Sequence, residues 1–332
     1  MKKYPSVSII LCTHNGEKKI EKSLSSLISQ NYPSDKYEII VVDDGSTDNT
    51  QKILRKYKVK ALKHKTKRGL AASRNTGLKI ATGDIVACYD DDCTADKNWL
   101  RNLVRGFEDQ GVMGCGGLMK LSDYPTLTDQ YLFESGYASP IPTTLGKSKS
   151  IFVRFCSYLE TNFTNPQAKY EDGIRVYELP GAMSSFRKKQ LIQMGGWNEQ
   201  YKNIAEDVEL CRRMRAAYPD YYFVVMPSAK VVHEQQMTFY GFLKKEFSRG
   251  KLRKQYYHLK NEVPPYFPGP IIIFVVTMFT FITPTILPFL LLLPLAIYPW
   301  WIFRSISQGN IKMILFPYMQ WLHETAIVMG MI

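Results

Sequence analysis

Three consecutive carboxylates, Asp90, Asp91 and Asp92, follow directly on a short apolar segment of the chain. That segment, residues 83–89, is rich in apolar and β-branched side chains, the pattern of a strand covered on both faces. Because adjacent anions repel one another, three of them at a strand end indicate a bound cation. Oxygen ligands of this kind suit Mg²⁺ or Mn²⁺, which share their remaining coordination positions with water and substrate phosphates. A solvated acidic loop is the alternative interpretation.

Two earlier apolar segments, residues 7–12 and 38–42, also stop at polar residues, and a segment with apolar side chains at helical spacing lies between them. Alternating strands and helices predict an α/β fold with a mostly parallel sheet and right-handed crossovers. In such a sheet the carboxyl ends of the strands form the ligand crevice, so we expect the polar residues that follow the strands to converge there. The residues after these two strands are Thr13, Asn15, Asp43 and Asp44.

Five short motifs, taken together, resemble the inverting glycosyltransferases of family 2, which have the A-type nucleotide-sugar-binding fold. The motifs occur in the family's order between about residues 5 and 235. They are residues 7–15, 41–48, 69–75, 90–92 and 195–207. The resemblance implies a Rossmann-like sheet that binds a nucleoside-diphosphate sugar. It also implies metal-dependent transfer of a hexosyl or N-acetylhexosaminyl group to a hydroxyl, with inversion.

The resemblance assigns nucleotide-sugar contacts to nine residues. It places Asp43 and Asp44 at the base and ribose, and Arg74 near the base or the diphosphate. Two small residues upstream of the last motif have no bulky side chain, so their backbone can approach a sugar closely; a tight turn is the alternative. The full set is Thr13, Asn15, Asp43, Asp44, Arg74, Asp90, Asp91, Gly181 and Ala182.

The metal is expected at the carboxylate triplet. Asp92 is the favoured ligand, Asp90 is a second ligand or a ribose contact, and Asp91 occupies the middle position of the motif. Which two of the three contact the metal is left open. His233 is a further expected ligand of the metal or the diphosphate, although a single histidine is more often structural.

A second pair of carboxylates, Glu206 and Asp207, supplies the expected chemistry. Acidic residues in the first turn of a helix are favoured by the helix dipole, which is a sufficient structural explanation for one of them. The resemblance gives Asp207 the role of general base toward the acceptor hydroxyl, with Glu206 as the alternative base. Trp197 is expected either to stack on the acceptor sugar or to pack in the core.

The composition changes after the catalytic domain, which we expect to span residues 1–240. Residues 241–265 form a basic amphipathic linker, and residues 266–332 are expected to be hydrophobic, membrane-associated helices. Residues 271–303 carry no charge but contain four prolines, which favours a broken hairpin in the membrane over a single kinked span. The basic run beside this segment predicts a cell-membrane location with the catalytic domain on the cytoplasmic face.

The expected partners are therefore a nucleoside-diphosphate sugar, with UDP-sugar as the commonest choice, a lipid-linked or membrane-proximal glycan acceptor, and membrane lipids. The formal net charge of +13 has no accompanying nucleic-acid motif, so nucleic acid is not an expected partner. A processive polysaccharide synthase and an inactive membrane scaffold of the same fold remain alternatives. The sugar, the base, the acceptor and the membrane topology are not determined by these motifs.

Overall fold

The computed structural model describes nine stretches of the chain, and they divide into two compact units. The described stretches are residues 4–120, 125–136, 151–163, 171–179, 181–201, 206–233, 238–260, 268–280 and 292–332. The first unit comprises residues up to 124, together with 136–146 and 166–235. The second comprises 125–135, 147–165 and 236–332, so two early segments join the C-terminal part rather than the sheet.

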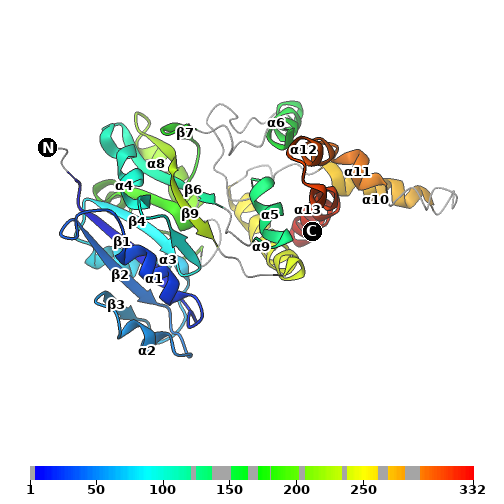
Figure 1. Ribbon diagram of the computed structural model, residues 1–332. Helices are drawn as coiled ribbons and strands as arrows, with labels where there is room; N and C mark the ends of the chain where they lie inside the picture. Colours follow the sequence, from blue (N-terminus) through cyan, green and yellow to red (C-terminus); the bar gives the residue numbers. More distant parts are fainter. Residues whose placement is uncertain are drawn as a thin grey trace. The chain divides into compact units, whose positions relative to one another are not determined.

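The first unit is built on one mixed sheet, whose strands are ordered β3-β2-β1-β4-β8-β6-β9-β5, with β7 also paired to β9 (Figure 1). Their bounds are β1 Val7–Thr13, β2 Tyr37–Asp43, β3 Lys60–Lys63, β4 Ile85–Asp90, β5 Cys93–Ala95, β6 Val112–Lys120, β7 Ile174–Val176, β8 Ser184–Arg187 and β9 Tyr222–His233.

The strand directions confirm the parallel prediction for one half of this sheet and show a mixed arrangement in the other half. Strands β3, β2, β1 and β4 (blue to cyan in Figure 1) are mutually parallel, as the strand–helix–strand pattern predicts. Strand β8, however, runs antiparallel to both of its neighbours, and β9 is antiparallel to β5 and β7. Strands β6 and β9 pair in parallel, so this half of the sheet is mixed. Strand β8 inserts between β4 and β6 from a distant part of the chain, and such a pairing leaves no local signal in the sequence.

Helices surround the sheet of the first unit and bury its apolar faces. They are α1 Ile20–Ile28, α2 Thr50–Leu54, α3 Leu70–Ile80, α4 Trp99–Arg105, α7 Lys188–Gln193 and α8 Glu206–Ala217, with short 3₁₀ turns η1 Gly106–Glu108 and η4 Gly181–Met183. Strand β4 is buried along its length until the chain reaches Asp90, which agrees with the expectation of a strand covered on both faces. The core includes Ile10, Val42, Phe186 and Phe223.

The second unit is helical. Its elements are α5 Leu127–Glu134, α6 Ile151–Phe163, α9 Phe239–Lys260, α10 Pro268–Thr280, α11 Leu293–Ile297, α12 Trp300–Gln308, η6 Ile311–Leu315 and α13 Phe316–Met331. Helices α9 and α13 pack closely where two glycines meet: a Cβ added to Gly250 would lie 2.9 Å from the Cα of Gly330. Most of the predicted basic linker is therefore a helix packed within this unit.

No helix in the described part of the chain has the length and apolar character needed to cross a bilayer. The middle of the expected hairpin, residues 281–291, lies outside the described residues. The predicted membrane-associated helices thus remain a prediction.

Candidate active site

The carboxyl ends of β1, β2 and β4 lie side by side at one edge of the sheet. In the strand register, Thr13 of β1 is level with Asp43 of β2, and Cys12 is level with Asp90 of β4. The residues that follow, Asp44 and the rest of the carboxylate triplet, therefore continue from the same edge. This confirms the expected convergence of the three strand ends.

The first two carboxylates of the triplet, Asp90 and Asp91, contact side chains from α3 and β1. Asp90 Oδ1 lies 3.7 Å from Arg74 Nη2, and Asp91 Oδ2 accepts a hydrogen bond of 2.5 Å from Thr13 Oγ1. Burial raises the pKa of Asp91 to about 6, and the adjacent Asp92 charge acts in the same direction while the hydrogen bond from Thr13 opposes it. Thr13 thus serves to hold the middle carboxylate.

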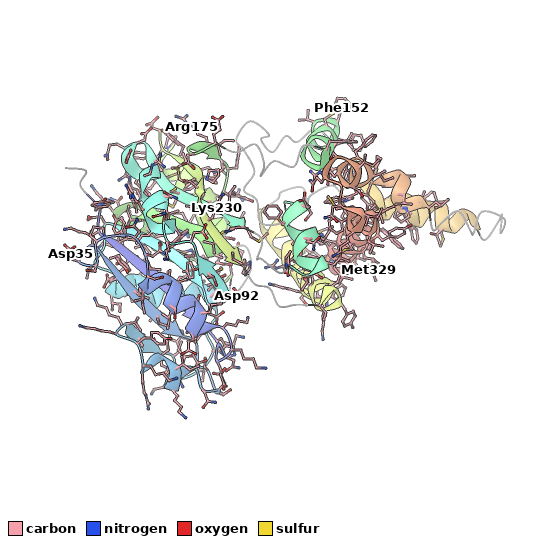
Figure 2. The ribbon with its side chains drawn as sticks, in the orientation of Figure 1. Asp35, Asp92, Phe152, Arg175, Lys230 and Met329 are labelled. Atoms are coloured by element: carbon pink, nitrogen blue, oxygen red, sulfur yellow. The ribbon has the colours of Figure 1, made fainter. Side chains whose placement is uncertain are left out.

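Asp92, labelled in Figure 2, lies against His233 at the end of β9. Asp92 Oδ1 is 2.9 Å from His233 Nε2, and Asp92 Oδ2 is 3.6 Å from Lys19 Nζ. In an octahedral Mg²⁺ site with bonds of about 2.1 Å, neighbouring ligand atoms lie about 3.0 Å apart. Asp92 Oδ1 and His233 Nε2 form a hydrogen bond at this distance, so they lie close enough to share a cation in place of the proton between them, whereas the third expected ligand, Asp90, faces Arg74.

The Asp43 carboxylate is buried and hydrogen-bonded to groups of the protein itself. Its side chain is fully buried and accepts hydrogen bonds from the Ser46 amide, at 2.8 Å, and from Gln51 Nε2. In this arrangement the Asp43 carboxylate is satisfied within the protein, and its predicted contact with the base or ribose stays a prediction. The turn after β2 folds back over the carboxylate, which satisfies it internally.

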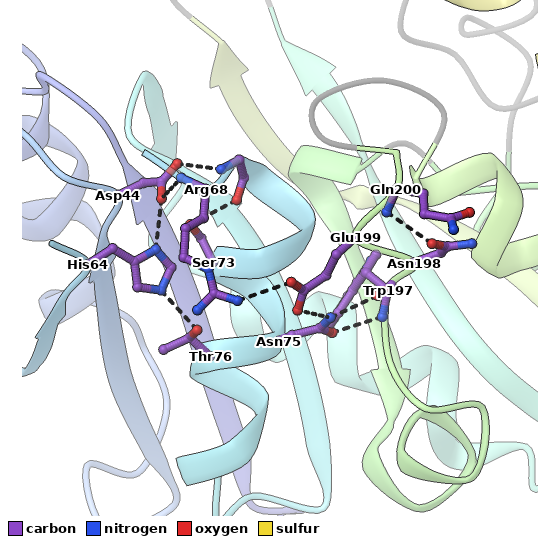
Figure 3. A network of polar contacts seen from close by, with 11 residues as sticks. Asp44, His64, Arg68, Ser73, Asn75, Thr76, Trp197, Asn198, Glu199 and Gln200 are labelled. Atoms are coloured by element: carbon purple, nitrogen blue, oxygen red, sulfur yellow. Dashed lines mark hydrogen bonds and ion pairs between the residues drawn. The ribbon is translucent and has the colours of Figure 1, made fainter. Parts of the chain in front are cut away.

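Asp44 fixes the beginning of α3 (Figure 3). Its Oδ1 accepts a hydrogen bond from the Arg68 amide at 2.8 Å and lies 2.7 Å from His64 Nδ1, and its Oδ2 accepts one from the Gly69 amide at 2.8 Å. Burial alone would raise the pKa of Asp44, but these hydrogen bonds outweigh it and lower the pKa. Gly69 has a φ of 100°, a conformation that favours glycine.

The same network joins α3 to residues 197–199 (Figure 3). Asn75 Nδ2 donates to the Trp197 carbonyl at 2.8 Å and to Glu199 at 3.1 Å, and Arg68 also donates to Glu199 at 3.1 Å. Trp197 itself is only 2% exposed and packs edge-on against Phe186. Trp197 thus packs in the core, as the alternative interpretation has it, and its predicted contact with the acceptor stays a prediction.

Arg74 and Glu206 form a buried ion pair. Arg74 Nη1 donates to Glu206 Oε1 at 2.9 Å, and the two side chains are 1% and 4% exposed. Burial raises the pKa of Glu206 to about 7, and the neighbouring Asp207 charge adds to the shift while Arg74 opposes it. Because Arg74 also approaches Asp90, it connects the strand end to the start of α8 from inside the protein.

Asp207, in contrast, is partly exposed at the start of α8. Its Oδ2 accepts a hydrogen bond of 2.9 Å from the Gly181 amide. A Cβ added to Gly181 would lie 2.8 Å from Arg74 Nη2, so the absence of a side chain there is explained by protein packing. Its neighbour Ala182, also expected near the sugar, is partly buried in η4.

Asn15 acts on the loop after β2 from a left-handed backbone conformation, with a φ of 54°. Its Oδ1 accepts a hydrogen bond from the Thr47 amide at 2.9 Å. Two residues near the site were not predicted from the sequence, Lys19 and His64. Lys19 lies just before α1, in the segment that follows β1. Its position after a strand that ends at the site could have indicated that it lies near the site. His64 lies in a basic stretch without periodicity, so the sequence around it gave no signal of its position.

The family model described as "Glycosyl transferase family 2" matches residues 8–189, which is more than half of the chain. Among curated proteins, the chain is 36% identical over 126 residues to the glycosyltransferase AglE of Haloferax volcanii. That alignment covers 36% of this chain and 41% of AglE, so the chain spans less than half of this relative's length.

Two solved structures have a similar fold. The mannosyltransferase PcManGT from Pyrobaculum calidifontis, in complex with GDP-Man and Mn²⁺, aligns with a TM-score of 0.60 at 19% identity, covering 99% of this chain and 88% of that chain. GalNAc-T7 with UDP, GalNAc and Mn²⁺ aligns with a TM-score of 0.52 at 18% identity, covering 69% of this chain and 43% of that chain. At these identities the similarity shows the fold alone.

Proposed function

This chain belongs to glycosyl transferase family 2, and on that basis we propose that it transfers a sugar from a nucleoside-diphosphate sugar to an acceptor hydroxyl. The proposed reaction is metal-dependent and inverts the anomeric centre. The observation that carries the proposal is the placement of Asp92 with His233 and of Asp207 with Gly181, all in the first unit. The nucleotide-sugar and Mn²⁺ complexes of the two similar structures support this choice of donor and metal.

Asp92 and His233 would hold the divalent cation in this proposal. When bound, the cation supplies positive charge that stabilises the departing nucleoside diphosphate. Their 2.9 Å separation and their mixed oxygen and nitrogen donors support this assignment. Asp91, held by Thr13, supports the loop that carries Asp92.

Asp207 is the proposed general base. Its Oδ2 accepts a hydrogen bond from the Gly181 amide and its Oδ1 accepts one from the Val208 amide at 2.8 Å, so the carboxylate is fixed in orientation while it stays partly exposed. Glu206 is buried and bonded to Arg74, so it is better suited to positioning α8 than to meeting an acceptor. This contrast favours Asp207 over the alternative base.

The proposed step is a single displacement. The acceptor oxygen bonds to the anomeric carbon while its proton passes to the Asp207 carboxylate. The bond between that carbon and the diphosphate oxygen breaks on the opposite face, and the nucleoside diphosphate leaves with the electron pair. A displacement from one face to the other inverts the anomeric centre without a covalent sugar–enzyme intermediate.

Metal-dependent nucleotide binding tests this proposal directly. We expect calorimetric titration to show that one of UDP, GDP or dTDP binds with Mn²⁺ present, and that Asp92→Asn weakens this binding at least about tenfold. Asp35, labelled in Figure 2 and exposed far from β4 in the sequence, provides the matched control Asp35→Asn, which should bind as the wild type does. Absence of binding to every nucleotide by a folded protein would exclude the transferase and favour the scaffold.

We also propose that the acceptor is lipid-linked or membrane-proximal and that the chain acts at the cytoplasmic face of the cell membrane. Large apolar side chains of the second unit are exposed, which supports this proposal. Exposed apolar surface of this kind commonly marks contact with a membrane or another protein. They include Phe152, Tyr240, Phe274, Phe303, Ile306 and Ile311.

The basic run within α9 adds attraction to anionic lipid. Sedimentation with vesicles tests the membrane proposal. The chain should bind vesicles containing anionic lipid, and Phe274→Ser combined with Phe303→Ser should reduce the bound fraction, whereas no binding at low salt would refute it.

A further inference from the structure

A thiol stands beside the proposed metal pair. Cys93 follows Asp92 directly and is level with His233 in the antiparallel register of β5 and β9. Its Sγ lies 4.0 Å from Asp92 Oδ1. One donor atom from each of Asp92, Cys93 and His233 lies within 4.8 Å of the other two, and among the described residues this is the group identified with metal-ligand spacing.

We propose that Asp92, Cys93 and His233 form a three-ligand site for a thiophilic divalent cation, Zn²⁺ or Cd²⁺. Such a cation would compete with Mg²⁺ or Mn²⁺ for Asp92 and His233. The position of the site rests on the proposed function, but binding of the thiophilic cation does not require that the chain transfers sugar. This chemistry depends on the cysteine, which Mg²⁺ does not use as a ligand.

The distances fit a tetrahedral cation. With bonds of about 2.0–2.3 Å, the ligand atoms of a zinc site lie about 3.3–3.8 Å from one another. The separation from Asp92 Oδ1 to His233 Nε2, 2.9 Å, lies below this range, and that from Asp92 Oδ1 to Cys93 Sγ, 4.0 Å, lies above it. Side-chain rotations are needed to bring the three donor atoms, all within 4.8 Å of one another, to bonding distance of one cation, and the fourth position remains for water or a substrate oxygen.

Burial and charge favour retention of the cation once it is bound. Cys93 is 1% exposed, so solvent does not compete at the sulfur. Bond formation releases the thiol proton to solvent, and the thiolate and the Asp92 carboxylate then neutralise the divalent charge. Lys19, 3.6 Å from Asp92 Oδ2, is the nearby cation that must turn away.

Cadmium absorption tests this site without any nucleotide. The probe is Cd²⁺ alone, titrated into a Cys156→Ser parent that lacks the exposed thiol. We expect thiolate-to-metal charge-transfer absorption that saturates at one equivalent, is lost in Cys93→Ser, and requires at least about tenfold more Cd²⁺ in His233→Ala. Cys115→Ser, a buried thiol on β6, is the control that should keep the band.

Circular dichroism establishes that each variant is folded, and Cys93→Ala repeats the test with a second side chain. The band in a folded Cys93→Ser protein, or no band in the parent, would overturn the proposal. Nucleotide titration of the same parent tests the proposed function separately. If the parent binds no nucleotide, the cadmium result still stands. If cadmium produces no band, the nucleotide result still stands.

Discussion

Replacement of Asp207 by Asn is expected to lower the turnover of sugar transfer by about 10²–10⁴-fold while nucleotide binding stays within about twofold of wild type. The amide has nearly the same shape as the carboxylate, and its oxygen can still accept the hydrogen bond from Gly181. It cannot take a proton from an acceptor hydroxyl. The loss should therefore appear in kcat rather than in the affinity for the nucleotide.

Transfer to an acceptor glycan and titration with the nucleotide, measured on the same preparation, separate these two effects. Asp220→Asn, an exposed carboxylate of the same unit, is the control and should turn over as the wild type does. If Asp207→Asn retains near-wild-type turnover, Asp207 is not the base. In that case Glu206→Gln becomes the decisive variant.

Arg74→Met is expected to reduce the free energy of unfolding by about 3–5 kcal/mol. The substitution leaves the buried Glu206 without the guanidinium that donates to it at 2.9 Å, and it removes the cation 3.7 Å from Asp90 Oδ1. Both partners of the Arg74–Glu206 pair are almost completely buried, so solvent cannot replace the lost interaction. Denaturant unfolding of the purified protein measures the change.

Two further variants separate the buried charge from general disruption. Arg74→Met combined with Glu206→Leu removes both charges and should recover most of the lost stability, because apolar pairs of similar volume replace buried ion pairs well. Arg105→Met breaks the exposed pair with Asp172, 3.4 Å apart, and should cost less than about 1 kcal/mol. Equal losses in Arg74→Met and Arg105→Met would contradict a special role for the buried pair.

The sequence predicted the parallel half of the sheet because each of its elements carries a local signal. Apolar strands end in polar residues, and an amphipathic helix returns the chain between them. The edge at which Asp44 and Asp92 lie follows from the direction of the strands, so their shared location needed no tertiary information. The mixed half, in which β8 is antiparallel to its neighbours and β6 is parallel to β9, depends on pairings between strands far apart in the chain, which leave no periodic pattern in the sequence.

The roles of individual side chains were harder to predict than their location. Motif position alone does not distinguish a carboxylate that faces a ligand from one that satisfies its own turn, and Asp43 belongs to the second kind. Trp197 was ambiguous for the same reason, since an aromatic ring suits both a sugar and a core. Asp92 and His233 were both predicted as metal ligands, which stays a prediction, and the fold brings them together along with Lys19 and Cys93.

The insertion of β8 between β4 and β6 has a consequence for synthesis of the chain on the ribosome. Strands β1 to β4 are synthesised first and can pair with one another. The edge of β4 that faces away from β1 has no partner until β8, which ends at residue 187, has been made. An open strand edge recruits strands of other chains, so the nascent protein passes through an aggregation-prone stage during which chaperones can act. His233 emerges later still, at the end of β9. Strand β9 also supplies Phe223 and Val225 to the core, so the core is completed by the same strand that brings His233 to Asp92, and a chain halted between residues 187 and 221 would have neither.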